Sequence, residues 1–132
     1  CTASAPLLTA GSYAGTTVGR TNDYTWLDNS PCQGASNGGG PDVVYRVVVP
    51  AGSTVTLDLL PDAWDATLNL INVSTGTCGS TSTMGVCVAG ADDPENISWT
   101  NSSASSVTLY VLVDGYSSTS SGTYTLTVSF VP

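Results

Sequence analysis

Ten acidic side chains carry most of the chemistry that this chain could perform. Two short motifs stand out, DAWDA with Asp62 and Asp65, and DDPE with Asp92, Asp93 and Glu95. Carboxylates that lie close together repel one another unless a cation or a proton is held among them. Oxygen ligands without nitrogen or sulfur favour Ca²⁺ over a transition metal. The five residues therefore predict a calcium site, provided that the fold brings the two motifs together.

The acidic residues also allow other interpretations. Asp-Asp-Pro and Pro-Asp-Ala are turn sequences, in which Asp side chains bond to the nearby backbone and stay in solvent. A second acidic group, for which turns are favoured over a metal site, surrounds a Gly-rich stretch and consists of Asp23, Asp28 and Asp42. The spacing of an EF-hand loop is absent. Paired carboxylates could serve a glycosidase, but that chemistry needs a carboxyl group with a raised pKa in a cleft, whereas most acids here lie in turn sequences.

The side chains that most catalytic sites need are nearly missing. The chain has no His, and its only basic residues are Arg20 and Arg46. A Ser or Cys nucleophile normally needs an adjacent His or Lys, and a reactive Cys needs a neighbour that lowers the pKa of its thiol. A typical zinc site needs His or several free Cys. We therefore expect a protein that is not an enzyme.

Composition indicates the surroundings in which the chain works. Its 132 residues carry a net charge of −8 and are 41% hydrophobic. Nucleic acids and anionic membranes attract basic patches, so both are disfavoured as partners, whereas cations are favoured. No apolar run approaches the roughly 20 residues of a transmembrane helix. The chain starts without a signal peptide, as expected of a processed secreted protein or a trimmed chain.

Four Cys in a small chain without Lys indicate disulfide bonds and an extracellular or cell-surface location. A bond between Cys78 and Cys87 would close a short loop, and one between Cys1 and Cys32 would hold the N-terminus. Alternatively, Cys1 carries a lipid, as in bacterial lipoproteins, or forms a disulfide between subunits. The even number of Cys favours the paired interpretation.

Alternating apolar and polar residues predict the elements that position these side chains. The clearest alternation lies in residues 122–131, and further strands are expected at 106–113, 53–59, 42–49, 66–73, 84–90 and 96–101, with a weaker one at 12–19. Residues 42–49 are apolar on both faces and predict a central strand. Pro50-Ala51-Gly52 predicts a turn, and Asp114-Gly115 together with the Ser-rich run 117–121 predicts a loop.

These strands predict one all-β domain over residues 1–132. The expected architecture is an antiparallel β-sandwich, jelly-roll-like, of about eight strands. Antiparallel pairing of 66–73 with 84–90 would place the start of the first strand beside the end of the second. The DAWDA and DDPE motifs would then meet at one edge of the sandwich.

Aromatic side chains outside the expected strands could form a binding surface. Trp64 lies between two Asp residues, and Trp26 and Tyr24 lie in a turn-rich stretch, where their rings could stack on sugar or collagen. Alternatively, each ring plugs one end of the sandwich, because aromatic residues commonly bury most of their area. N-glycosylation motifs, which also arise by chance in Ser-rich chains, begin at Asn72, Asn96 and Asn101.

Three segments, taken in order, resemble a known family. They are PDVVYRVVVPAGSTVTLDLLPDAWDATLNLINV, CVAGADDPENISW and SVTLYVLVDGYSSTSSGTYTLTV, within roughly residues 12–131. The series resembles the bacterial pre-peptidase C-terminal domain family, which is similar to the collagen-binding domains of clostridial collagenases. The resemblance implies a secreted, calcium-stabilised, non-catalytic β-sandwich that is usually appended to a larger enzyme. The chain departs from this pattern in its four Cys and in the lack of a collagen-binding surface motif, and its 132 residues are expected to hold the sandwich without an enzyme domain.

Two kinds of function fit these features. The first is an extracellular structural module that assembles with copies of itself into a surface or fibre structure, with calcium fixing the loop end around Asp65 and Asp92. An unpaired edge strand can accept a strand from a neighbour, and the N-terminal segment 1–11, an exchanged or tethered strand, offers Leu7 and Leu8 as plugs. The second is a calcium-dependent accessory module of a secreted enzyme that binds collagen or a carbohydrate such as a polysaccharide. We expect the first.

Overall fold

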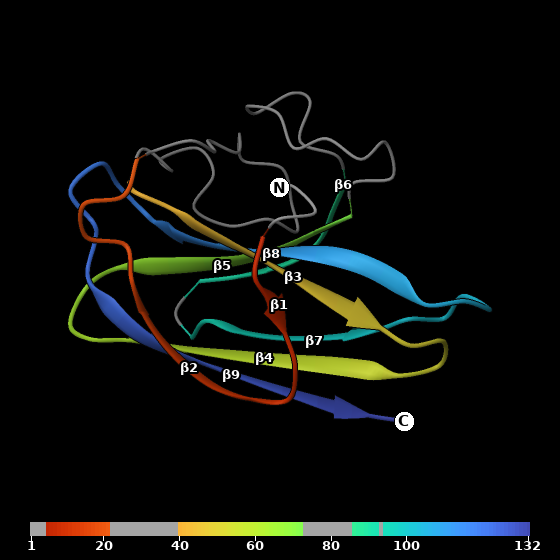
Figure 1. Ribbon diagram of the computed structural model, residues 1–132. Coiled ribbons are helices and arrows are strands. Elements are labelled where there is room, and N and C mark those ends of the chain that lie inside the picture. Colours follow the sequence, from red (N-terminus) through yellow and green to blue (C-terminus); the bar gives the residue numbers. More distant parts are fainter. Residues whose placement is uncertain (1–4, 22–39, 73–85, 93) are drawn as a thin grey trace.

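The computed structural model describes residues 5–21, 40–72, 86–92 and 94–132. Within these ranges the chain forms nine β-strands in two sheets that pack face to face (Figure 1). The expected all-β sandwich is therefore confirmed, with nine strands where about eight were expected. None of the described segments forms a helix that is long and apolar enough to cross a membrane.

The two sheets differ in size. The larger has the strand order β1-β3-β8-β5-β6, and comprises β1 (Leu7–Leu8), β3 (Val43–Val49), β8 (Val107–Gly115), β5 (Ala66–Asn72) and β6 (Val86–Ala91). The smaller has the order β2-β9-β4-β7, and comprises β2 (Gly11–Thr16), β9 (Thr123–Val131), β4 (Thr54–Pro61) and β7 (Asn96–Thr100). Neighbouring strands are antiparallel except β1, which runs parallel to β3.

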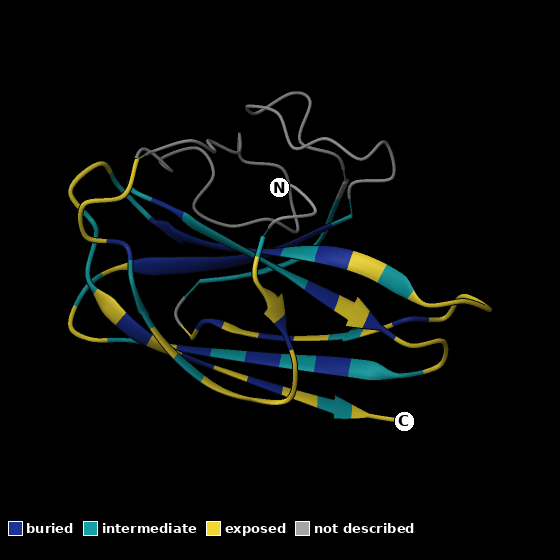
Figure 2. Cartoon of the chain, in the orientation of Figure 1, coloured by how far each residue is buried: buried dark blue, intermediate teal, exposed yellow. Residues whose placement is uncertain are grey.

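The core lies between the sheets, and β9 shows how the sequence specifies it. Tyr124, Leu126 and Val128 are buried, whereas the Thr residues between them are exposed (Figure 2). A strand places alternate side chains on opposite faces, so one face of β9 packs inward and the other meets water. Leu57 of β4 and Val111 of β8 are fully buried in the same core. Each such aliphatic side chain contributes roughly 1.5–3 kcal/mol to stability.

The larger sheet is buried on both faces along β5. Every residue of this strand except Asn72 is buried, including Thr67 and Asn69. These two polar residues alternate with core residues and therefore lie on the outer face of the sheet. Burial of that outer face could not be inferred from the alternation alone.

The predicted turn after β3 is present. The N–H of Ser53 donates a hydrogen bond to the carbonyl of Pro50 at 3.1 Å. Gly52 has a φ of 74°, which glycine adopts without steric cost. The turn joins β3 of the larger sheet to β4 of the smaller sheet.

The predicted loop is confirmed for the Ser-rich run 117–121, which lies between β8 and β9, but the placement of Asp114-Gly115 in that loop is wrong. Both residues end β8 and pair with Thr67 and Ala66 of β5. The ladder to β5 continues through them because it satisfies their backbone groups. The carbonyl oxygen of Ser120 lies where a Cβ atom at position 115 would be, so glycine is needed there for close packing.

The N-terminal segment lies along one side of the sandwich as an edge strand. Arg46 fixes it, because its N–H donates to the Pro6 carbonyl and its Nε donates to the Ala5 carbonyl, both at 2.9 Å. Of the two expected plugs, Leu8 is buried and Leu7 is 45% exposed. Within the described ranges, the short β1 pairs with Arg46 and Val47 of β3 alone. The rest of β3 therefore lacks a described neighbour strand on that side, whereas a central strand is paired on both sides.

Candidate functional site

Asp65 is positioned by a tight connection between the sheets. Residues 62–65 must carry the chain from the end of β4 to the start of β5. Ala63 has a φ of 62°, a left-handed conformation that costs a non-glycine residue about 1–2 kcal/mol. Contacts on both sides hold the connection: Trp64 Nε1 donates to the Thr123 carbonyl at 2.7 Å, and the N–H of Tyr116 donates to the Asp65 carbonyl at 3.0 Å.

Asp92 and Glu95 come from a second crossing, between β6 and β7. Antiparallel pairing sets the last residue of β6 opposite Leu68, near the start of β5. In the other sheet, the first residue of β7 lies opposite Asp58, near the end of β4. The two crossings therefore lie at the same end of the sandwich, as the sequence predicts from the pairing of these strands.

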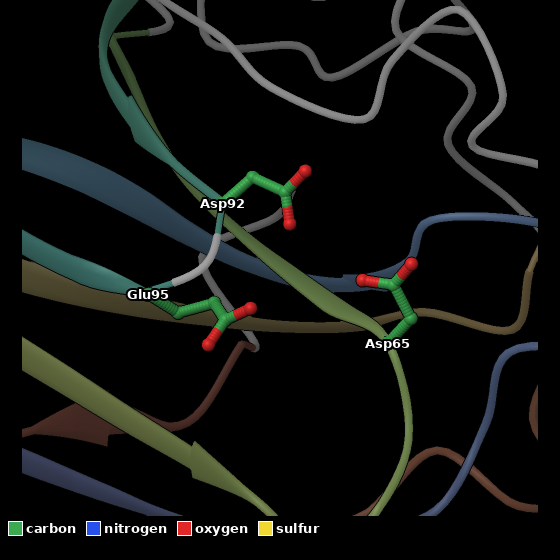
Figure 3. A group of neighbouring side chains, drawn as sticks. All are labelled: Asp65, Asp92 and Glu95. Carbon is green, nitrogen blue, oxygen red and sulfur yellow. The ribbon is translucent and has the colours of Figure 1, made fainter.

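Three carboxylates meet where the two crossings approach each other. One oxygen from each of Asp65, Asp92 and Glu95 lies within 4.8 Å of the others. Figure 3 shows the three side chains converging on a common space from the ends of different strands. Asp65 is exposed, but Glu95 is buried and the Oδ1 atom of Asp92 is shielded from solvent. Partial burial strengthens the repulsion among three negative charges, which a cation would relieve.

The donor set fits calcium. Ca²⁺ binds oxygen ligands at about 2.3–2.6 Å, so two ligands on opposite sides of the ion are about 5 Å apart. The spacing of the three carboxylates is compatible with one such ion between them. Mg²⁺ binds at about 2.0–2.1 Å with near-octahedral geometry, and would require a tighter arrangement.

Of the predicted ligands that the structure describes, Asp62 is not part of this group. Asp62 Oδ2 accepts a hydrogen bond from Thr123 Oγ1 at 2.6 Å, and its N–H donates to the Thr123 carbonyl at 3.0 Å. These bonds direct Asp62 toward β9. Asp93 lies outside the described residues.

A hollow of about 450 Å³ adjoins the carboxylates and is partly lined by Trp64, Asp65 and Glu95. Trp64 is half-buried. Its ring lies where a Cβ atom at Gly122 would collide with it, so glycine at 122 permits this packing. Trp64 thus stabilises the crossing and also lines the hollow.

One buried acid was not singled out from the sequence. Asp114 follows Val113 in β8, and Asp42 precedes Val43 in β3; because Val43 and Val113 are opposite each other, the two acids are cross-strand neighbours. Burial and, to a lesser extent, the negative charge of Asp42 together raise the pKa of Asp114 to about 8, against the opposing effect of a hydrogen bond from the Gly115 N–H. The available signal was an Asp that directly continues the apolar run VLV.

Several predicted residues lie outside the described part of the chain, namely Cys1, Tyr24, Trp26, Cys32 and Cys78, together with Asp23 and Asp28. Cys87 is described and is disulfide-bonded. The predicted pairing of Cys87 with Cys78, and that of the other two Cys, stay predictions.

The sequence matches no family model and no curated protein. Its fold, however, is similar to that of solved structures. The pre-peptidase C-terminal domain of a collagenase from Bacillus anthracis aligns over 95% of this chain and 94% of its own, with a TM-score of 0.56 and 17% identity. PliG of Aeromonas hydrophila, a periplasmic inhibitor of g-type lysozyme, aligns over 96% of both chains, with a TM-score of 0.61 and 14% identity.

A third similar structure is the Yersinia pseudotuberculosis-derived mitogen, with a TM-score of 0.53 and 14% identity over 90% of this chain and 83% of that chain. At these identities the likeness concerns the fold alone. The fold implied by the resemblance to pre-peptidase C-terminal domains is thus supported, whereas membership of that sequence family is not shown. The chain has the sandwich fold of these domains, on which unrelated functions occur.

Proposed function

We propose that the chain is a non-catalytic extracellular accessory module whose loop end is fixed by calcium. The observation that carries the proposal is the meeting of Asp65, Asp92 and Glu95 at the two sheet crossings. A bound Ca²⁺ would join the β4–β5 crossing to the β6–β7 crossing by neutralising charges that otherwise repel. The ion would serve structure, by ordering loops that a partner can then contact.

Two further facts support a binding role over catalysis. The sequence has no His and no Lys, so it lacks the bases that usually activate a nucleophile. Among proteins of similar fold, one is a domain of a collagenase and another inhibits a lysozyme. Location outside the cell fits the periplasmic neighbour and the disulfide-bonded Cys87.

A calcium titration followed by thermal unfolding tests the proposal. We expect Ca²⁺ to raise the Tm of the chain, since a ligand that binds only the folded state stabilises it. Asp92→Asn should abolish most of this rise. Asp62→Asn is the matched control, because Asp62 belongs to the same crossing but bonds to Thr123. An equal response of both variants to Ca²⁺, or no response of the parent chain, would contradict the proposal.

A second candidate function is assembly with copies of the same chain. It is favoured by β1, which has only two residues, lies at the sheet edge and inserts Leu8 between the sheets. Exchange of such a short strand between two copies would reproduce the same contacts in each. Sedimentation and electron microscopy, with Ca²⁺ and with a chelator, should then reveal dimers or fibres. A monomer at all concentrations in both conditions would exclude assembly.

A further inference from the structure

A cavity of about 480 Å³ opens on the side of the sandwich where the edges of β2 and β3 approach each other. Among the described residues, β1 pairs with Arg46 and Val47 of β3 and leaves the first half of that strand without a described strand neighbour on this side. The walls of the cavity include Gly15, Arg20, Asp42, Val44, Tyr45 and Tyr124. The volume lies within the range of small-ligand sites.

The backbone of Val44 faces this cavity. The N–H of Asp42 donates to the Thr21 carbonyl at 3.1 Å, and that of Arg46 donates to the Pro6 carbonyl at 2.9 Å. Both bonds point away from β8, on the side that β1 occupies. Peptide groups alternate in direction along a strand, so the N–H and C=O of Val44 point to the same side. Among the described residues no partner bonds to these two groups of Val44.

Arg20 brings a positive charge to the same cavity. It is exposed and is one of only two basic residues in a chain of net charge −8. The other, Arg46, is engaged with the Ala5 carbonyl. Within the described ranges the guanidinium of Arg20 makes no ion pair and no hydrogen bond, and it remains available to an anion.

Two tyrosine side chains, one from each sheet, line the cavity. The hydroxyl groups of Tyr45 and Tyr124 are 2.6 Å apart and hydrogen-bonded. A Cβ atom at Gly15 would lie 2.5 Å from the Tyr124 hydroxyl, so glycine at this position leaves room for the ring beneath β2. The two sheets are therefore joined at the cavity wall by this hydrogen-bonded tyrosine pair.

We propose that this cavity binds a short extended peptide that carries a carboxylate, with Val44 pairing with the peptide backbone and Arg20 binding the carboxylate. A free N–H and C=O on one strand residue match the backbone of an added strand, which is how sheet edges capture peptides. A guanidinium binds a carboxylate through two parallel hydrogen bonds. Asp42, which also lines the cavity, disfavours a second negative charge beside it. The inference rests on the proposed accessory function and names its ligand class.

The experiment uses the isotope-labelled chain and acetyl-tetraalanine with a free carboxylate, followed by amide chemical shifts. We expect shifts at Val44, Tyr45 and Gly15, and roughly tenfold weaker binding when the carboxylate is replaced by an amide or when Arg20 is changed to Gln. Val18→Ala is the matched control, because Val18 is exposed and lies on the same segment but does not line the cavity. It should bind as the parent chain does.

N-methylated peptides test the backbone pairing. Methylation of the one amide that pairs with Val44 should abolish binding, whereas methylation at the other positions should have little effect. Equal binding of all N-methylated peptides, equal binding of the amidated peptide, or no shifts up to about 10 mM peptide would overturn the inference. The calcium titration does not involve the cavity, so a failure here is distinct from a failure of the proposed function.

Discussion

Asp114→Asn should stabilise the protein at neutral and alkaline pH. Asp114 is 3% exposed, and burial together with Asp42 raises its pKa from 3.8 to about 8. In the unfolded chain this carboxyl loses its proton near pH 4, whereas in the folded chain it keeps the proton until near pH 8. Between these values the folded state binds more protons, so its stability falls as the pH rises. Asn is neutral at every pH and can accept the same hydrogen bond from Gly115.

The magnitude follows from the two pKa values. Each unit of difference between the pKa in the folded and unfolded chain is worth about 1.4 kcal/mol of stability. The difference between 3.8 and about 8 therefore gives an upper bound of about 6 kcal/mol. Relaxation of the surroundings and water penetration on ionisation lower this cost. We expect the free energy of unfolding of the parent chain to fall by about 2–3 kcal/mol relative to Asp114→Asn between pH 4.5 and pH 8.

Urea unfolding followed by tryptophan fluorescence measures this difference at several pH values, with a chelator present so that metal binding does not contribute. Asp42→Asn should also raise the stability at high pH, but by less than Asp114→Asn. It removes the negative charge that repels ionised Asp114, whereas Asp114 itself stays buried. Asp62→Asn serves as the control, because it removes a carboxylate that is exposed. If the stability difference between the parent chain and Asp114→Asn stays constant across the pH range, the reasoning about this buried pair is refuted.

Four other substitutions test the packing on the open side of the sandwich, each by urea or thermal unfolding. Leu8→Ala should cost about 2–5 kcal/mol because Leu8 is buried, whereas Leu7→Ala should stay within about 0.5 kcal/mol; equal effects would contradict the placement of β1. Gly15→Ala should destabilise by about 1–3 kcal/mol, since the added methyl group meets the Tyr124 hydroxyl, and a neutral effect would argue against that contact. Tyr45→Phe should cost about 0.5–1.5 kcal/mol through the lost hydrogen bond, and an unchanged Tm would count against it.

The parts of the structure that depend on local periodicity could be predicted from the sequence. Alternation along β9 specifies its buried face, and antiparallel pairing of β5 with β6 is enough to bring Asp65 near Asp92. The direction of Asp62 could not be predicted, because it depends on the left-handed turn at Ala63 and on Thr123, which is distant in the sequence.

Burial of the outer face of the larger sheet was the main structural feature that could not be predicted from the sequence. Thr67, Asn69 and Asp114 alternate with core residues and look like a solvated face, yet all three are buried. For the same reason the interaction between Asp114 and Asp42 could not be predicted from the sequence. The cavity beside Val44 depends on how far β1 runs along β3, and this length is set by tertiary pairing that no local pattern encodes.

The proposed calcium site and the proposed peptide cavity share a set of contacts. Trp64, next to Asp65, donates to the Thr123 carbonyl and packs over Gly122. Gly122 in turn accepts from the N–H of Thr17 at 3.0 Å and donates to Thr17 Oγ1 at 3.1 Å, three residues before Arg20.

A ligand that orders one end of these contacts should favour binding of the second ligand at the other end, and the change in affinity must be the same in both directions. We therefore expect Ca²⁺ to strengthen peptide binding and the peptide to strengthen Ca²⁺ binding by the same factor. Trp64→Phe, which keeps an aromatic ring but loses the bond to Thr123, should weaken this coupling while each ligand still binds alone. Peptide affinities measured with Ca²⁺ and with a chelator decide the matter. Equal affinities in the parent chain would show that the two sites act independently, even if both exist.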